Sequence, residues 1–227
     1  VVNGQLTAMA DQISSLASSI AQLNKAIVAA QGSGLGNSPN DLLDQRDEKI
    51  RQLAELVDVR TVAQTDGSVN VFIGKGQPLV VGQKANMLEA RAGVDDPFRV
   101  DLGFVSGVEF QNVNQLLTGG SLGGLLDFRR ETLDRTFNEF GRIALGVADA
   151  INQQQKLGLD LEGNLGTDVF LDINDESLIY QRAIPQSGNA LPDNRVLSVE
   201  ISDVGALTTS DYILEITGTG STYRLLR

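Results

Sequence analysis

Seven apolar residues near the start of the chain recur at alternating intervals of three and four residues, and these are Leu6, Met9, Ile13, Leu16, Ile20, Leu23 and Ile27. This heptad spacing places one continuous apolar stripe along a helix. Such a helix is stable only when its stripe is buried against a partner. We therefore expect a helix over about residues 3–31 whose stripe forms part of a packed core, so that Ile20→Ala costs about 2–5 kcal/mol.

The positions beside this stripe carry small or amide side chains, where an isolated coiled coil usually carries Glu and Lys. Uncharged flanks suit close packing against further protein and favour a building block over a catalyst. The candidate subunit contacts on these flanks are Ala10, Gln12, Ala17, Ser19 and Asn24. Ordinary exposure of each residue on the helix surface is the alternative interpretation.

Two further helices are predicted from start signals and spacing. Ser38 and Pro39 have the residue types of an N-cap and a first helical position, which predicts a helix over about 39–57. After Gly119-Gly120, a second heptad stripe predicts a helix over about 121–157, with Ser121 as its cap. Its expected core residues are Leu126, Leu133, Phe137, Phe140, Val147 and Ile151. For Phe137→Ala we expect the same loss of stability as for Ile20→Ala, about 2–5 kcal/mol. We expect this helix to pack alongside the first one.

Between these helices the apolar period changes to two. Alternation over 59–63 and 69–73 around Asp66-Gly67 is typical of a β-hairpin. Short strands are also predicted at 78–81, 86–91, 99–104 and 108–110, and later at 195–201, 212–217 and 222–226.

The fold class predicted from these elements is α+β. A helical bundle domain over 1–168 holds a small antiparallel β insertion at about 59–112. Residues 169–227 are expected to form the start of a separate, mainly-β domain. We expect this domain to be truncated because the chain ends inside a strand pattern.

Composition excludes several classes of function. The chain has no His and no Cys, which removes disulfides, the usual zinc, copper and haem ligands, and imidazole-based catalysis. A net charge of −11 disfavours nucleic acid and anionic membranes as partners. No transmembrane run or cleavable signal peptide is visible. We expect no enzyme activity, no cofactor and no bound metal.

Two acidic groups keep chemical alternatives open. Asp44 and Glu48 lie one turn apart on a predicted helix and have the residue types of a glycosidase carboxylate pair, although a solvated helix face explains them as well. The oxygen-rich run from Asp172 to Glu176 has ligands for a weakly bound divalent cation, and solvated loop acids are the alternative.

The runs Asn40–Asp47, Asp66–Val71, Gly76–Val80, Gly123–Arg129 and Leu145–Asn152, in this order, resemble the flagellar hook-associated protein 1 (FlgK) family over about residues 1–170. The resemblance implies a structural component of the bacterial flagellum that joins hook to filament as a ring of subunits. It also implies contacts with neighbouring hook and junction proteins, and export through the flagellar channel to the cell exterior without a cleaved signal.

The family's terminal helical segments, which drive polymerisation and would bind an export chaperone, have no counterpart in this sequence, so we expect a monomeric piece. The rival interpretations are another flagellar axial protein, of the flagellin or hook type, and a carboxylate-based glycan hydrolase acting through Asp44 and Glu48.

Overall fold

The computed structural model describes residues 1–32, 39–93, 98–106, 109–184, 197–217 and 222–226. Contacts divide the chain into two compact units, Val1–Arg129 and Arg130–Arg227. This division differs from the predicted domains, 1–168 and 169–227, because residues 130–168 make most of their contacts within the second unit. No helix in the described ranges has both the length and the apolar content to span a bilayer.

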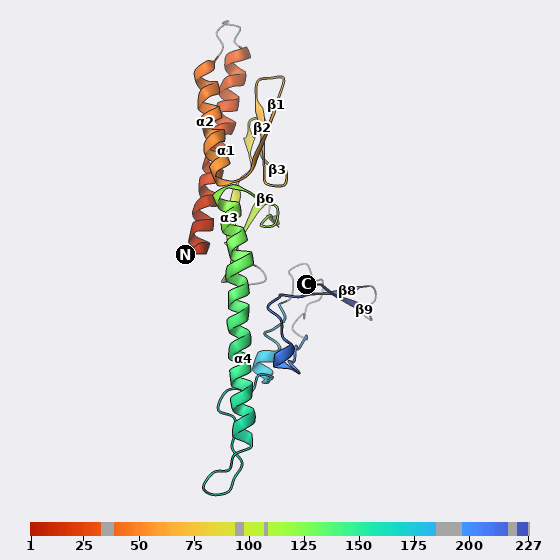
Figure 1. Cartoon of the computed structure of the whole chain (residues 1–227). Coiled ribbons are helices and arrows are strands. Elements are labelled where there is room, and N and C mark those ends of the chain that lie inside the picture. The colour runs from red at the N-terminus through yellow and green to blue at the C-terminus, as the bar shows by residue number, and fades with distance from the viewer. Residues whose placement is uncertain (33–38, 94–97, 107–108, 185–196, 218–221, 227) are drawn as a thin grey trace. The chain divides into compact units, whose positions relative to one another are not determined.

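The first unit is built on a helical hairpin (Figure 1). Helix α1 (Val2–Gly32) and helix α2 (Asn40–Leu56) lie side by side, with two small sheets along them and α3 (Gly120–Phe128) at their base. Ser38, the predicted cap of α2, lies outside the described residues, and Pro39 occupies the N-cap position. Gly119 rather than Ser121 caps α3, and the Ser121 hydroxyl donates to the Glu55 carbonyl (3.3 Å).

Both sheets of the first unit are antiparallel. One has the order β1-β2-β3-β4 (Val59–Ala63, Val69–Ile73, Gln77–Val81, Lys84–Ala85), and the other has the order β5-β6-β7 (Leu88–Ala92, Val100–Ser106, Glu109–Asn112). The predicted hairpin is formed, and its register places Val59 opposite Ile73 and Ala63 opposite Val69. A register shift after Val71 places Pro78 opposite Phe72. Alternation buries Val71, Ile73 and Leu79 against the helices.

The most buried face of α1 differs from the predicted stripe. Leu6, Ile13, Ile20 and Ile27 are fully buried, Leu16 is 7% exposed, and Met9 and Leu23 are half-buried. The other fully buried positions of α1 are Ala10, Ala17 and Asn24. The helix is turned so that these small residues face its partners, because α2 covers one side of the stripe while β3 to β6 cover the other. Small side chains allow that close approach.

The predicted helix over 121–157 comprises three elements. After α3, residues Arg129–Asp134 form a π-helix, and α4 continues over Arg135–Lys156. A π-helix closes its hydrogen bonds over five residues rather than four, so a heptad counted through it does not stay on one face. Leu126 is accordingly buried while Leu133 is half-buried. Phe137, Phe140, Val147 and Ile151 are exposed, which corrects the expectation that they are core residues.

The second unit contains α4, the short helix α5 (Glu176–Ile179), the 3-10 turn η2 (Val204–Ala206) and a two-stranded hairpin, β8 (Ile213–Thr217) and β9 (Thr222–Leu226). The strand predicted at 195–201 is not formed in its described part, 197–201. The backbone N–H and carbonyl of Ile201 bond instead to the Asn174 side chain, at 2.9 Å each, and so cannot join a ladder.

Candidate functional site

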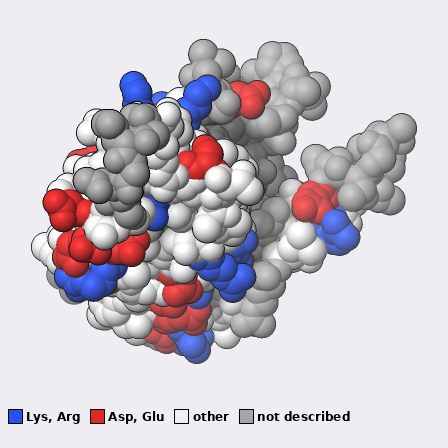
Figure 2. Space-filling view, turned by 90° about the horizontal axis from the view of Figure 1, so that it is seen from above, with Lys and Arg blue, Asp and Glu red and all other residues white. Residues whose placement is uncertain are grey.

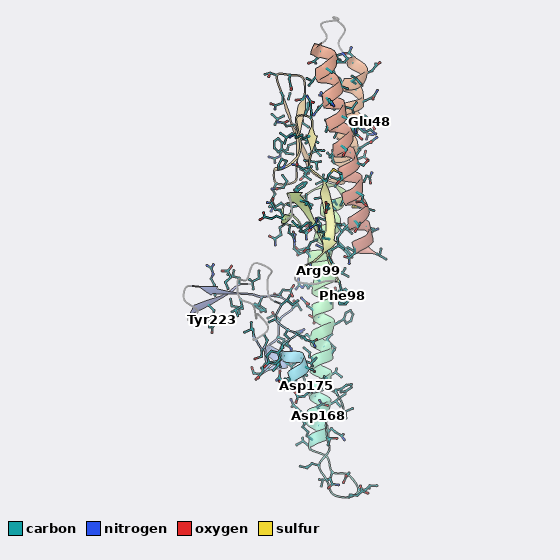
Figure 3. All side chains as sticks on the ribbon, turned by 180° about the vertical axis from the view of Figure 1, so that it is seen from behind. Glu48, Phe98, Arg99, Asp168, Asp175 and Tyr223 are labelled. Atoms are coloured by element: carbon teal, nitrogen blue, oxygen red, sulfur yellow. The ribbon has the colours of Figure 1, made fainter. Side chains whose placement is uncertain are left out.

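The acidic pair on α2 does not have the properties of a glycosidase site. Arg51 donates two hydrogen bonds to the Glu48 carboxylate (2.8 and 2.7 Å) and Gln52 donates a third (2.9 Å). Hydrogen bonding from Arg51, and then from Gln52, lowers the pKa of Glu48 from 4.5 to about 2. A carboxyl group with that pKa is not protonated near neutral pH and cannot act as a general acid there. Asp44 and Glu48 are both exposed on the helix surface, and Figure 3 shows the position of Glu48 on α2.

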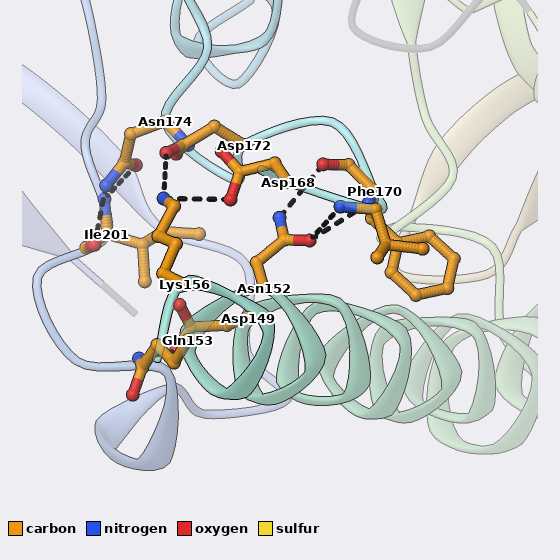
Figure 4. A network of polar contacts seen from close by, with 10 residues as sticks. Asp149, Asn152, Gln153, Lys156, Asp168, Phe170, Asp172, Asn174 and Ile201 are labelled. Carbon is orange, nitrogen blue, oxygen red and sulfur yellow. Dashed lines mark hydrogen bonds and ion pairs between the residues drawn. The ribbon is translucent and has the colours of Figure 1, made fainter. Parts of the chain in front are cut away.

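Two acids of the run from Asp172 to Glu176 accept hydrogen bonds from the chain itself, and Figure 4 shows the surroundings of Asp172. Asp172 accepts from the Asn174 N–H (2.7 Å), and Asp175 accepts from the Ser177 N–H (2.9 Å) as the N-cap of α5. Lys156 lies 2.9 Å from Asp168 and 3.9 Å from Asp172. Within the described ranges no three His, Cys, Asp or Glu residues converge as metal ligands. The predicted cation site is therefore not assembled there.

The five candidate subunit contacts on α1 separate into two groups. Ala10, Ala17 and Asn24 are fully buried inside the first unit, which corrects their assignment as surface contacts. Gln12 is exposed and Ser19 is half-buried, with its hydroxyl donating to the Ser15 carbonyl (3.0 Å). These two residues stay candidates, and they lie on the solvent-facing side of α1, together with the exposed residues Ala8, Ser15 and Gln22.

The polar residues of α4 hold the rest of the second unit. Asn138 donates to the Thr209 carbonyl (3.0 Å), and Arg142 donates to the Leu207 carbonyl (3.4 Å). Asn152 is buried, with 4% of its surface exposed. Its Nδ2 donates to the Phe170 carbonyl (2.9 Å), and its Oδ1 accepts the N–H groups of Val169 (3.0 Å) and Phe170 (2.9 Å) (Figure 4).

Five large apolar residues of the same helix are instead open to solvent. Their exposed fractions are 65% for Phe137, 65% for Phe140, 54% for Ile143, 50% for Val147 and 40% for Ile151. We call this set the α4 apolar face. An amphipathic helix normally buries such a face, so α4 turns its polar side toward its own chain and leaves its apolar side open.

An apolar hollow adjoins the α4 apolar face. It has a volume of about 500 Å³, and its lining residues are Ala144, Leu145, Val147, Ala148, Phe170, Leu171, Ile173 and Leu178. Small residues, Gly141, Ala148 and Ala150, lie beside its central residues, and the charged neighbour Glu139 is paired with Arg142 (2.5 Å). A broad apolar surface with small flanks is suited to close packing with another helix, because small side chains let the two backbones approach.

Charge elsewhere is distributed rather than concentrated. On the face seen in Figure 2, acidic and basic side chains are interspersed. Many of the charged groups are paired locally, as Arg51 is with Glu48 and Glu55. We therefore take the α4 apolar face as the candidate functional site of the described chain.

Sequence reasoning missed the buried polar residues Asn24, Arg46 and Asn152. A signal was present for Arg46, which precedes Ile50 by four residues and Leu53 by seven and so shares their face of α2. Asn24 likewise lies at the heptad position of Ala10 and Ala17. Asn152 offered no comparable signal, because its partners come from a loop.

The chain is similar to known flagellar proteins. The family model described as "Flagellar hook-associated protein FlgK helical domain" matches residues 1–170. Flagellar hook-associated protein 1 of Escherichia coli K12 is 37% identical over 213 residues, which are 93% of this chain and 38% of the relative. The Salmonella typhimurium LT2 protein of the same name is 36% identical over 220 residues, 96% of this chain and 38% of the relative.

A solved structure shows the same fold. It is described as the flagellar hook junction protein FlgK from Burkholderia pseudomallei, and it aligns with a TM-score of 0.76 at 37% identity. The alignment covers 99% of this chain and 39% of that one. The α+β architecture is therefore shared, and the chain spans little more than a third of the length of these relatives.

Proposed function

The chain belongs to the flagellar hook-associated protein FlgK family, and from that premise we propose that it is a structural part of a bacterial flagellum, joining hook to filament within an assembled ring of subunits. The names of the relatives and the solved structure support this role. The proposal assigns no catalytic step to the chain. It also places the protein outside the cell, in the flagellum, after export without a cleaved signal.

The observation that carries the proposal is the α4 apolar face. Its five large apolar side chains are each 40–65% exposed, while the polar residues of the same helix hold the chain's own loops. A building block that is completed by further protein, from the rest of its own chain or from a neighbour, has this arrangement, since an apolar face of this size is normally covered. Gln12 and Ser19 on α1 are secondary candidates for subunit contacts.

We infer homo-oligomerisation and contacts with adjoining hook and junction proteins, together with an export chaperone that binds outside this chain. Residues 169–227 would begin an outer β-domain, which the exposed hairpin residues Tyr223 (75%) and Leu225 (59%) support, because a lone two-stranded hairpin is rarely stable in water (Figure 3).

The test of the junction role is localisation in flagella. A tagged full-length version should label the boundary between hook and filament in electron micrographs, and cells lacking the protein should shed filaments. Label along the whole filament would favour a flagellin-like protein, and label along the hook would favour a hook-type protein.

The role of the α4 apolar face can be tested with two substitutions on that face. Phe137→Gln with Phe140→Gln should abolish filament attachment in that full-length protein while leaving its export intact. The matched control is Arg135→Gln, which changes an exposed residue of α4 outside the apolar face and should retain attachment. Normal attachment in the double variant would contradict the role assigned to this face.

A further inference from the structure

Arg46 of α2 is a charged residue inside the first unit, with 7% of its surface exposed. Its Nη1 donates to the Gly67 carbonyl (2.9 Å) and to Oδ1 of Asn24 (3.3 Å). Its Nε is buried and has no hydrogen-bond partner among the described residues. Its carboxylate neighbour is Asp47, whose Oδ1 lies 3.9 Å from Nε and whose side chain is 73% exposed.

Asn24 of α1 joins this guanidinium to the first sheet. Its Nδ2 donates to the carbonyls of Val69 (2.8 Å) and Gly82 (2.6 Å), while its Oδ1 accepts from the Val69 N–H (3.2 Å). The amide thus pairs with both backbone groups of Val69, as a neighbouring strand would. Arg46 and Asn24 together connect both helices to the β1–β2 turn and to the turn after β3.

This arrangement is a poor way to gain stability. Burying a cation costs free energy that incomplete pairing does not return, and replacing a buried charged group with an apolar residue of similar volume is often neutral or stabilising. Apolar residues of α1 and α2 also share one core, and such contacts are non-directional, so they specify the alignment of the two helices less sharply than hydrogen bonds do. The hydrogen bonds from Arg46 to Gly67 and Asn24 specify one alignment, because their geometry is satisfied only there.

We propose that Arg46 is a positioning residue: it fixes the β1–β2 turn on the helical hairpin and adds little or nothing to the net stability. The consequence concerns β1, an edge strand exposed from Arg60 to Ala63. With the turn held by Arg46, this strand keeps one orientation relative to α1 and α2. Without it, the turn samples several arrangements over an intact helical core.

The test is Arg46→Met in the 227-residue chain, with native-state hydrogen exchange read residue by residue. The melting temperature should stay the same or rise. Exchange at the amides of Gly67, Ser68 and Val69 should become about tenfold faster or more, since local opening of the turn no longer breaks the Arg46 bonds. Amides inside α1, such as that of Ala17, should be unchanged.

Two further variants sharpen the result. Arg46→Gln keeps a neutral donor able to reach toward Gly67 and should restore part of the protection of the turn. Arg51→Met removes an exposed arginine of the same helix and should leave the turn amides unchanged.

The proposal is overturned if Arg46→Met fails to fold or melts at a clearly lower temperature with uniformly faster exchange, since Arg46 would then be an ordinary stabilising residue. Unchanged exchange at the turn would overturn it as well.

Discussion

The contribution of a side chain to the stability of this protein depends on whether the fold covers it, so two residues of the same type can differ widely in that contribution. Ile13 and Ile20 of α1 are fully buried, whereas Ile151 of α4, also at a heptad position, is 40% exposed. Asn24 is buried with each of its polar atoms bonded. The contribution of each residue to the free energy of unfolding therefore depends on its packing rather than on its hydropathy alone.

The first residue-scale prediction compares two apolar truncations. Ile20→Ala should lower the free energy of unfolding by about 2–5 kcal/mol, because it leaves a cavity in a closed core. Phe137→Ala should change it by less than about 0.5 kcal/mol, since the ring is largely in water. Chemical denaturation of both variants measures this, and equal losses would show that Phe137 is buried in solution.

The second residue-scale prediction concerns acid. The pKa of Glu48 is lowered to about 2 by Arg51 and Gln52, so its contribution to stability is complete above pH 4.5 and is lost as the pH falls toward 2. Hydrogen bonding from Ser68 and Ser177 lowers the pKa values of Asp66 and Asp175 in the same direction. The melting temperature should therefore fall below about pH 4.5.

Glu48→Gln isolates the first of these groups. This variant should melt at a slightly lower temperature than the unchanged protein, and the difference should be small because the carboxylate is exposed and screened by solvent. The difference should be largest above pH 4.5 and absent near pH 2. Asp44→Asn on the same helix is the control. A deficit that does not depend on pH would assign the effect to packing instead.

At the scale of elements, the joins between segments determine where the helices can pack. Gly119 and Gly120 have φ values of +71° and +58°, in the left-handed region that favours glycine. They let α3 begin directly against the end of α2, where the Asp58 N–H donates to the Thr118 carbonyl (2.8 Å). The π-helix at 129–134 has a different effect, since it breaks the heptad count between Leu126 and Phe137.

Two glycines of α3 give a matched pair of substitutions. Gly120→Ala should destabilise the first unit, because its Cβ would lie 2.3 Å from the Leu56 carbonyl carbon at a strained φ. The Cβ of Gly124→Ala would meet nothing within 4 Å in an exposed part of the helix. This substitution should raise the free energy of unfolding by about 0.5–1 kcal/mol. Thermal melts compare them, and stabilisation by both would refute the tight join.

At the scale of the whole molecule, the two units differ in how much apolar surface they bury. The first has a continuous core that includes Leu6, Leu53, Val71, Leu102 and Leu122. In the described part of the second, Ile173 is the only buried apolar side chain. Stability scales with the area removed from water, so the second unit depends more on polar contacts such as those of Asn152.

Limited proteolysis should reveal this difference. We expect early cleavage within residues 130–227 and a protected fragment that ends near Arg129, because a unit with little core opens at low free-energy cost. Mass spectrometry of the fragments provides the measurement. Early cleavage inside α1 or α2 would show that the core of the first unit is not the stable part of the chain.

The sequence by itself determined the elements: period, turn residues and glycines predicted α1, α2, the β1–β2 hairpin and the helical stretch from 121 to 157, because those signals are local. The tertiary structure alone decided which faces are covered. Ala10, Ala17 and Asn24 are internal because two sheets approach α1, and Phe137 and Phe140 are open because no described element covers that side of α4. Burial depends on partners distant in sequence, and residue spacing within one helix carries no information about them.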